Sequence, residues 1–195
     1  DFFGAKPDGL NLQKLKDNPH GLDLGPMEPQ LPALLKTPNK KIDLTPEIIM
    51  NDVARLDAHV PEDVLVLIGR RHVRSVNSWM NNLRFLVKGK NPCLLLMHPD
   101  DAVRLRVETG ERVRVKSRHL SLEALLEVTD TMRPGVLCLP HGYGQNVPGT
   151  QLSTASKLDT VSFNDISDET DLDVPSATPA LHSVAVTVEK LIAVT

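Results

Sequence analysis

Aromatic residues make up only 3% of this 195-residue chain, and the two cysteines, Cys93 and Cys138, lie far apart within apolar runs. The core must therefore be built mainly from the aliphatic residues in the 41% hydrophobic fraction. Without a Cys-x-x-Cys pair, the chain offers neither a zinc ribbon nor an iron–sulfur site of its own. We expect both thiols to be buried and reduced, as free cysteines in apolar surroundings usually are.

Long apolar runs and a strong net charge are also missing. No run approaches the roughly 20 residues that a membrane helix needs, so no membrane segment is expected. A net charge of -3 gives no general attraction to nucleic acid, and none is expected as a partner. The seven histidines show no HExxH or other close ligand spacing, so we expect no metal ligand.

The first residues, DFFGAKPDGL, carry no basic stretch followed by an apolar one and no initiator methionine. We therefore expect no signal peptide, an excised fragment and a cytoplasmic location.

Proline is concentrated at the beginning of the chain. Residues 1–59 hold seven of the 15 prolines and show little periodicity, which disfavours both helices and paired strands. We predict an irregular inter-domain segment over 1–59, with one short helix around PEIIMNDVARL. Thr45 suits the cap of that helix and Pro46 its first turn. Residues 60–195 form the second predicted domain.

Beyond residue 60 the sequence has short runs typical of strands. Continuous apolar runs favour buried strands, and alternating runs favour half-buried ones. The predicted strands are 64–69, 93–98, 111–118, 120–130, 133–140 and 183–191. Residues 120–130 also suit a helix, but their position after a strand favours a strand. One helix is predicted from Pro99 to Gly110. This pattern predicts a mainly β fold, a barrel with few short helices rather than a doubly wound sheet.

The stretch IGRRHVRSVNSWMNNLR follows the first buried run and is rich in arginine and small polar residues. Arginine forks match phosphate oxygens, and Ser and Asn add neutral donors. The stretch therefore indicates a polyanionic ligand with a polar heterocycle, and the alternative is a solvated basic loop. Its chemistry-bearing residues are Arg70, Arg71, Arg74, Ser75, Asn77, Ser78, Asn81, Asn82 and Arg84.

Two further stretches carry candidate chemistry. In LPHGYGQN, Gly142 and Gly144 could present backbone N–H groups to an anion, although an ordinary surface loop is the alternative. His141 there could act as a base, but no Ser or Cys stands at a diagnostic spacing. The acidic stretch FNDISDETDLDVPSATPAL is typical of solvated surface, and it could instead pair with the arginine stretch or face guanine-type donors.

Taken in order, four stretches resemble the molybdopterin dinucleotide-binding domain that ends the chains of formate dehydrogenases, nitrate reductases and dimethyl sulfoxide reductases. They are LIGRRHVRSVNSW, LLLMHPDDAVRLRVETGERVRVKSR, VTDTMRPGVLCLPHGYG and FNDISDETDLDVPSATPAL. The resemblance covers about residues 60–190. Elements such as HP-x-DA, G-[DE]-x-V-x-V and P-G-V are weak singly and specific together. Upstream, LLKTPNKKIDLTPEII resembles the segment that leads into this domain.

The resemblance implies a double-psi β-barrel covering one side of a molybdenum cofactor built from two molybdopterin guanine dinucleotides. It implies no catalytic or metal-ligating residue in this chain, because the molybdenum ligand and any iron–sulfur cluster belong to other domains of the parent enzyme. Those domains are the expected partners, and the isolated chain is expected to be inactive. The implied cofactor-binding residues are Arg70, Arg71, Arg74, Ser75, Asn77, Ser78, Asn81, His141, Gly142, Tyr143 and Asn164.

Two other functions fit such a barrel. One is a stand-alone double-psi binding module without a redox role, which would need neither the arginine stretch nor residues 1–59. The other is a self-processing decarboxylase-like barrel, which requires a Gly-Ser dipeptide that this chain lacks. The parent's substrate, whether formate, nitrate or another, depends on residues outside these 195.

Overall fold

The computed structural model describes residues 10–57 and 64–191, and the chain divides into two units, Asp1–Pro46 and Glu47–Thr195. In the described part of the first unit the only regular element is helix α1 (Leu12–Asp17). The Asn11 side chain caps it by accepting from the Lys14 backbone N–H, and none of its residues is buried. Apart from α1, the described residues 10–46 are irregular.

The second unit opens with two short helical pieces, α2 (Glu47–Met50) and the 3-10 helix η1 (Val53–Asp57). They stand where one helix was predicted, and Pro46 directly precedes α2. The predicted domain boundary after residue 59 lies outside the described residues.

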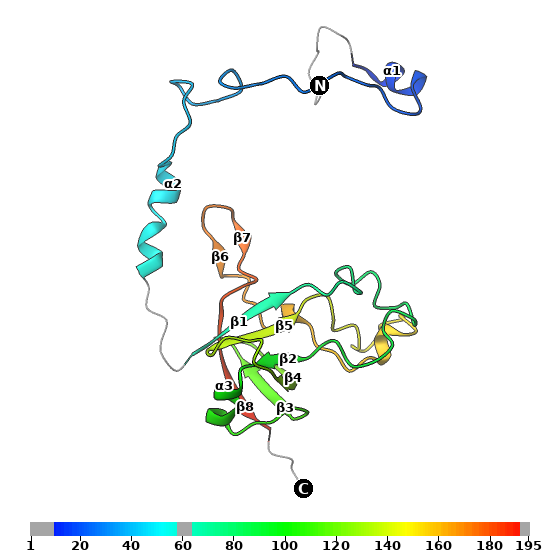
Figure 1. Ribbon diagram of the computed structural model, residues 1–195, viewed down its shortest axis with the longest axis vertical. Helices are drawn as coiled ribbons and strands as arrows, with labels where there is room; N and C mark the ends of the chain where they lie inside the picture. The colour runs from blue at the N-terminus through cyan, green and yellow to red at the C-terminus, as the bar shows by residue number, and fades with distance from the viewer. Residues whose placement is uncertain (1–9, 58–63, 192–195) are drawn as a thin grey trace. The chain divides into compact units, whose positions relative to one another are not determined.

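Six strands close into a barrel in the order β1-β5-β2-β4-β3-β8 (Figure 1). Two neighbouring pairs are parallel, β1 with β5 and β2 with β4, and the other pairs are antiparallel. This mixed closed barrel with few helices confirms the predicted double-psi class. The strands are β1 (Leu65–Arg70), β2 (Leu95–Met97), β3 (Arg112–Lys116), β4 (Ser121–Val128), β5 (Val136–Pro140) and β8 (Val184–Lys190).

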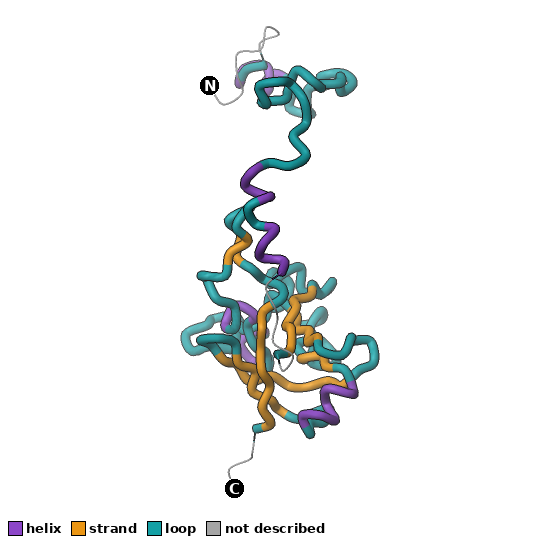
Figure 2. The backbone as a smooth tube through the Cα atoms, turned by 90° about the vertical axis from the view of Figure 1, so that its left-hand side faces the viewer, coloured by secondary structure: helices purple, strands orange, loops and turns teal. Residues whose placement is uncertain are grey.

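Aliphatic side chains fill the barrel, as the scarcity of aromatics requires. In β3, β4 and β8 burial alternates along the strand, because successive side chains point to opposite faces. Residues 120–130, which also suited a helix, form β4, where the pattern of buried residues has a period of two. Figure 2 shows the strands wound around this interior. The fully buried members include Leu67, Leu95, Met97, Val113, Val115, Leu126, Leu137 and Leu139.

The helix predicted from Pro99 to Gly110 is shorter than expected. Helix α3 (Pro99–Leu105) begins at Pro99, with the His98 ring accepting from the Asp100 N–H at 3.1 Å. It ends five residues early because Arg106 adopts a left-handed conformation with φ 56°. That turn directs Val107, only 4% exposed, into the core. The chain then enters β3.

The remaining elements are short. They comprise the 3-10 helices η2 (Ala155–Lys157) and η3 (Phe163–Asp165) and the two-stranded β6 (Leu172–Asp173) with β7 (Thr178–Pro179). Both 3-10 helices lie between β5 and β8 in the sequence, in the long excursion that contributes to the candidate site.

A buried carboxylate ties α3 to the turn before β5. Asp101 Oδ2 accepts from the Gly135 N–H at 2.7 Å, and Oδ1 accepts from Arg104 at 2.9 Å. Asp101→Ala leaves the Gly135 N–H without its acceptor, so we expect the free energy of unfolding to fall by about 1–3 kcal/mol in urea denaturation. The control is Asp100→Ala, whose side chain is 80% exposed at the helix start. It should cost only about 0.3–1 kcal/mol. Equal losses in the two variants would contradict this role for Asp101.

Candidate functional site

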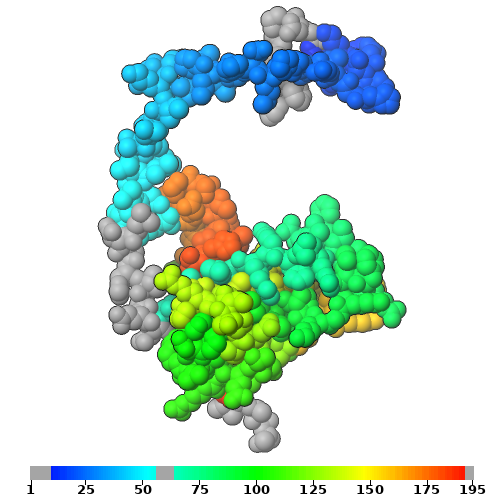
Figure 3. All heavy atoms as spheres, in the orientation of Figure 1, coloured from blue at the N-terminus to red at the C-terminus, as the bar shows by residue number. Residues whose placement is uncertain are grey.

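The site begins where two parallel strands end side by side. In the β1–β5 ladder Arg70 lies opposite Pro140, and the His141 N–H donates to the Arg70 carbonyl at 2.9 Å. The segments that follow these strands therefore leave the barrel together. We call them the arginine loop, residues 70–82, and the glycine loop, residues 141–145. Figure 3 shows the surface lobe, teal to green, that holds the arginine loop.

The two loops are fastened by hydrogen bonds and close packing. Asn81 Nδ2 donates to the Gly142 carbonyl at 2.6 Å, and Gln145 Nε2 donates to the same oxygen at 2.9 Å. Gly142 has φ 97°, and a Cβ there would lie 1.9 Å from the Asn77 carbonyl oxygen. The loops can approach this closely only because residue 142 has no side chain.

A third segment, residues 160–164, packs against the glycine loop. The Gly144 N–H donates to Thr160 Oγ1 at 3.2 Å, and a Cβ on Gly144 would lie 2.6 Å from that of Ser162. The ring of Phe163 meets His141 edge-on, with centroids 6.3 Å apart. The predicted meeting of the three loops is thus confirmed.

Eight of the 11 predicted site residues fall into two groups by burial, and Arg70, His141 and Gly142 are half-buried. Ser75, Asn81 and Tyr143 are 1%, 2% and 5% exposed, so their side chains are largely enclosed by the protein. Ser75 Oγ donates to the His72 carbonyl at 2.9 Å, and the Tyr143 ring packs edge-on against His72. These three side chains position the loops against one another.

The second group faces outward. Arg71, Arg74, Asn77 and Ser78 are exposed on the arginine loop, and Asn164 is exposed next to Phe163. Arg71 Nη1 donates to Asn77 Oδ1 at 2.7 Å, which orients that guanidinium along the loop. The structure therefore gathers four cationic or amide side chains at one end of the barrel.

Arg70 and His72 hold buried polar atoms without a partner. Arg70 Nη2 donates to the Pro92 carbonyl at 3.4 Å, but Arg70 Nε and His72 Nδ1 are enclosed with no hydrogen bond. Burial lowers the pKa of His72, and the neighbouring Arg70 and Arg74 lower it further. No sequence motif distinguished His72, because a single histidine among arginines has no diagnostic spacing.

A small pocket of about 70 Å³ lies where the arginine loop begins, and Arg71, His141 and Phe163 help to line it. His182 also lines it, and its Nδ1 accepts from the Gly69 N–H at 3.2 Å. Burial lowers the pKa of His141, and Arg71 adds to that effect. No sequence signal linked His182 to residues 113 positions earlier.

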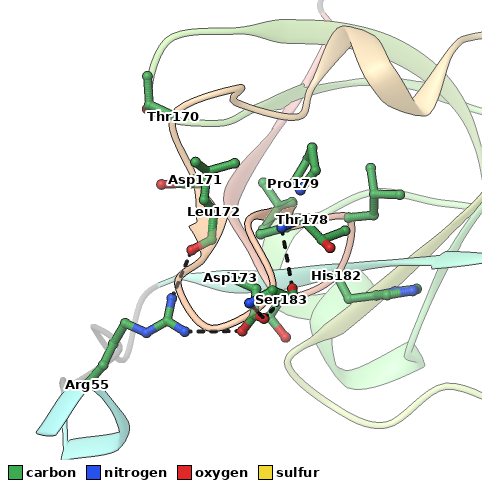
Figure 4. A pocket seen from close by; sticks show the side chains of 13 residues that line it. Arg55, Thr170, Asp171, Leu172, Asp173, Thr178, Pro179, His182 and Ser183 are labelled. Atoms are coloured by element: carbon green, nitrogen blue, oxygen red, sulfur yellow. Dashed lines mark hydrogen bonds and ion pairs between the residues drawn. The ribbon is translucent and has the colours of Figure 1, made fainter. Parts of the chain in front are cut away.

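The acidic stretch does not pair with the arginine loop in the described part of the chain. Arg118 lies 3.4 Å from Asp171 and 3.8 Å from Asp168 instead. Arg55 donates to the Leu172 carbonyl at 3.1 Å and lies 3.5 Å from Asp173, at a pocket of about 750 Å³ beside β6 and β7 (Figure 4). The suggested pairing with the arginine loop is therefore wrong, because these other cations are closer.

Both cysteines are free and buried, as predicted. Burial raises the pKa of Cys93 to about 11 and also raises that of Cys138. Neither thiol is activated as a nucleophile. Over residues 10–57 and 64–191, no cluster of His, Cys, Asp and Glu has the arrangement of a metal site. Among the helices described, none has the length and apolarity needed to span a bilayer.

Comparison with known families identifies the family of the barrel. The family model described as "Molydopterin dinucleotide binding domain" matches residues 65–185, more than half of the chain. The match contains the first five barrel strands and the first two residues of β8, together with the three converging segments. The chain therefore belongs to the molybdopterin dinucleotide-binding domain family.

Individual relatives are much longer than this chain. The NADPH-Fe(3+) oxidoreductase subunit alpha of Geobacter sulfurreducens, from strains DL-1 / KN400 and PCA, is 32% identical over 96 residues. That alignment covers 48% of this chain and 11% of the relative. The structure of acetylene hydratase from Pelobacter acetylenicus superposes with a TM-score of 0.56 at 22% identity. It covers 67% of this chain and 19% of the hydratase, and shows a shared fold.

The closeness of the two loops at Gly142 can be tested by adding one methyl group. Gly142→Ala should separate the loops, because its Cβ would collide with the Asn77 carbonyl. The matched control is Gly149→Ala, which has a similar φ of 88° but open space around its Cβ. The positive φ should cost about 1–2 kcal/mol in both variants. The collision should cost Gly142→Ala about 1–3 kcal/mol more in thermal unfolding. Equal stability of the two variants would show that the loops are not held this closely.

Proposed function

We propose that this chain binds a bis(molybdopterin guanine dinucleotide) molybdenum cofactor as the C-terminal domain of a larger oxidoreductase. The observation that carries the proposal is the junction of the arginine loop, the glycine loop and residues 160–164 at one end of the barrel. The family assignment supports a molybdopterin dinucleotide, and the guanine form and the pairing of two such groups are part of the proposal.

The residues at this junction have the chemistry that such a cofactor needs. A dinucleotide carries a diphosphate, which pairs with guanidinium forks such as those of Arg71 and Arg74. Its heterocycles carry amide and ring-nitrogen groups, which match Asn77, Asn164 and backbone groups. The partnerless Arg70 Nε is a further donor, and the partnerless His72 Nδ1 can donate or accept a hydrogen bond. The available donors thus fit the group.

Large apolar side chains are exposed on the arginine loop and just after it. Val73 is 89% exposed, Trp79 82% and Phe85 66%. Several exposed apolar residues close together in sequence are typical of a surface that another domain covers. This exposure supports the remaining domains of the parent enzyme as the partners of this face.

The chemistry of the parent lies outside this chain. When bound, the cofactor supplies the redox-active metal, and the residues described here bind it, orient it and exclude water on one side. We propose a formate dehydrogenase-like or nitrate reductase-like parent, with the molybdenum ligand and an iron–sulfur cluster in other domains. The 195-residue chain alone should accordingly show no turnover. The relatives, of which the chain spans about a tenth, support a larger parent.

Substitution of the exposed arginines tests the proposal. In the parent enzyme, Arg71→Ala and Arg74→Ala should each remove a charge-assisted hydrogen bond, worth about 1.5–3 kcal/mol. That loss corresponds to about a 10- to 100-fold weaker cofactor affinity. Molybdenum and pterin content per protein after gel filtration should therefore fall.

The control is Arg114→Ala in β3, where the guanidinium pairs with Glu123 at 2.7 Å. This variant should retain the cofactor at the wild-type level while losing the same charge. Unchanged cofactor content in both loop variants would refute the proposed binding face.

A further inference from the structure

A further pocket is lined in part by the arginine loop, and most of its lining residues are not among the predicted site residues. It measures about 230 Å³. His72, Arg74 and Asn81 contribute from the arginine loop, Tyr143 from the glycine loop, and Lys88, Gly89 and Lys90 from the segment that leads to β2. The two lysines belong to none of the motifs singled out in the sequence.

The pocket carries positive charge without a counter-charge. Between residues 64 and 99 the chain has six Arg and Lys residues and no Asp or Glu, although its net charge is -3. No ion pair found in the described ranges involves any of these six cations. Arg74, Lys88 and Lys90, which line the pocket, are all exposed. Three like charges held together in a pocket repel one another unless an anion joins them.

One side chain that lines the pocket also has a buried nitrogen without a hydrogen-bond partner. His72 lines the pocket and buries Nδ1 without a partner. Arg70 lines the pocket of about 70 Å³ instead, and its Nη2 donates to the carbonyl of Pro92, a lining residue of the present pocket, at 3.4 Å. Buried polar groups are normally paired, so the unpaired His72 nitrogen in a cationic pocket supports a polar ligand there.

We propose that this pocket binds a phosphate or diphosphate group through Lys88, Lys90, Arg74 and His72. The volume is below the roughly 300–1,000 Å³ typical of whole small-molecule sites, and suits one charged group of a ligand. Gly89, with φ 105°, turns the chain sharply between the two lysines that line the wall.

The anion has two sources of the same chemistry. One is the diphosphate of the proposed dinucleotide, in which case the inference rests on the proposed function. The other is a free phosphate-bearing molecule. The proposed anion site does not depend on that choice, because either source would neutralise its cations.

The test uses the 195-residue chain and inorganic pyrophosphate at constant ionic strength, followed by nuclear magnetic resonance. Wild-type protein should bind saturably, with shifts at residues 72–90. The His72 pKa, which its surroundings lower, should move upward when the anion is bound. The double variant Lys88→Gln/Lys90→Gln should bind at least about tenfold more weakly, because two charge-assisted contacts are lost.

The control is Lys36→Gln/Lys157→Gln, which removes the same charge from two exposed lysines outside the pocket. It should bind pyrophosphate as the wild type does, and thermal unfolding should find all three proteins equally folded. An equal loss of binding in both double variants would mean that net charge alone explains pyrophosphate binding. That result would overturn the proposal that the pocket binds the anion. Absence of saturable binding to the wild type would overturn it as well.

A second arm separates the sources. If Lys88→Gln/Lys90→Gln also lowers cofactor content in the parent enzyme, the dinucleotide supplies the anion. If Lys88→Gln/Lys90→Gln abolishes pyrophosphate binding by the chain while the parent with the same substitutions keeps its cofactor, a free phosphate-bearing ligand supplies the anion. Failure of the proposed function is detected separately, through Arg71→Ala, because Arg71 lies outside this pocket.

Discussion

The parallel ladder between β1 and β5 is the constraint on which the candidate site depends. Parallel neighbours end at the same edge, so pairing Arg70 with Pro140 brings together two loops that are 70 residues apart. An antiparallel pair would have sent the loops to opposite ends of the barrel. The Asn81–Gly142 hydrogen bond depends on that shared starting point, and the Phe163–His141 ring contact adds a third segment to it.

The loops use their polar residues for two different tasks. Enclosed side chains such as Asn81 and Ser75 hydrogen-bond to carbonyls of the loops, which therefore keep a defined shape without regular secondary structure. Exposed side chains such as Arg71 and Arg74 are left to meet a ligand. The exposed cations repel one another, and the hydrogen bonds within the loops oppose that repulsion.

Much of the fold followed from the sequence because the barrel strands are short and strongly patterned. The arginine stretch and the two glycines also indicated the loops that meet at one end of the barrel, partly through the family resemblance. What the sequence could not indicate were contacts set by tertiary packing. His182 reaches Gly69, and Arg55 reaches Asp173, across more than 110 residues. The early end of α3 depends on the left-handed Arg106, a conformation that no propensity favours for arginine.

In the described part of the chain, charged side chains are paired in some regions and unpaired in residues 64–99. Carboxylates of the acidic stretch find Arg118 and Arg55, and β3 pairs Arg114 with Glu123 and Lys116 with Glu189. The stretch from 64 to 99 has no acid with which to do the same. A solvated basic loop would tolerate this, but it would not bury Arg70 Nε and His72 Nδ1 without partners. Unsatisfied buried polar atoms are costly in a protein alone, so they support a ligand rather than solvent at this end of the barrel.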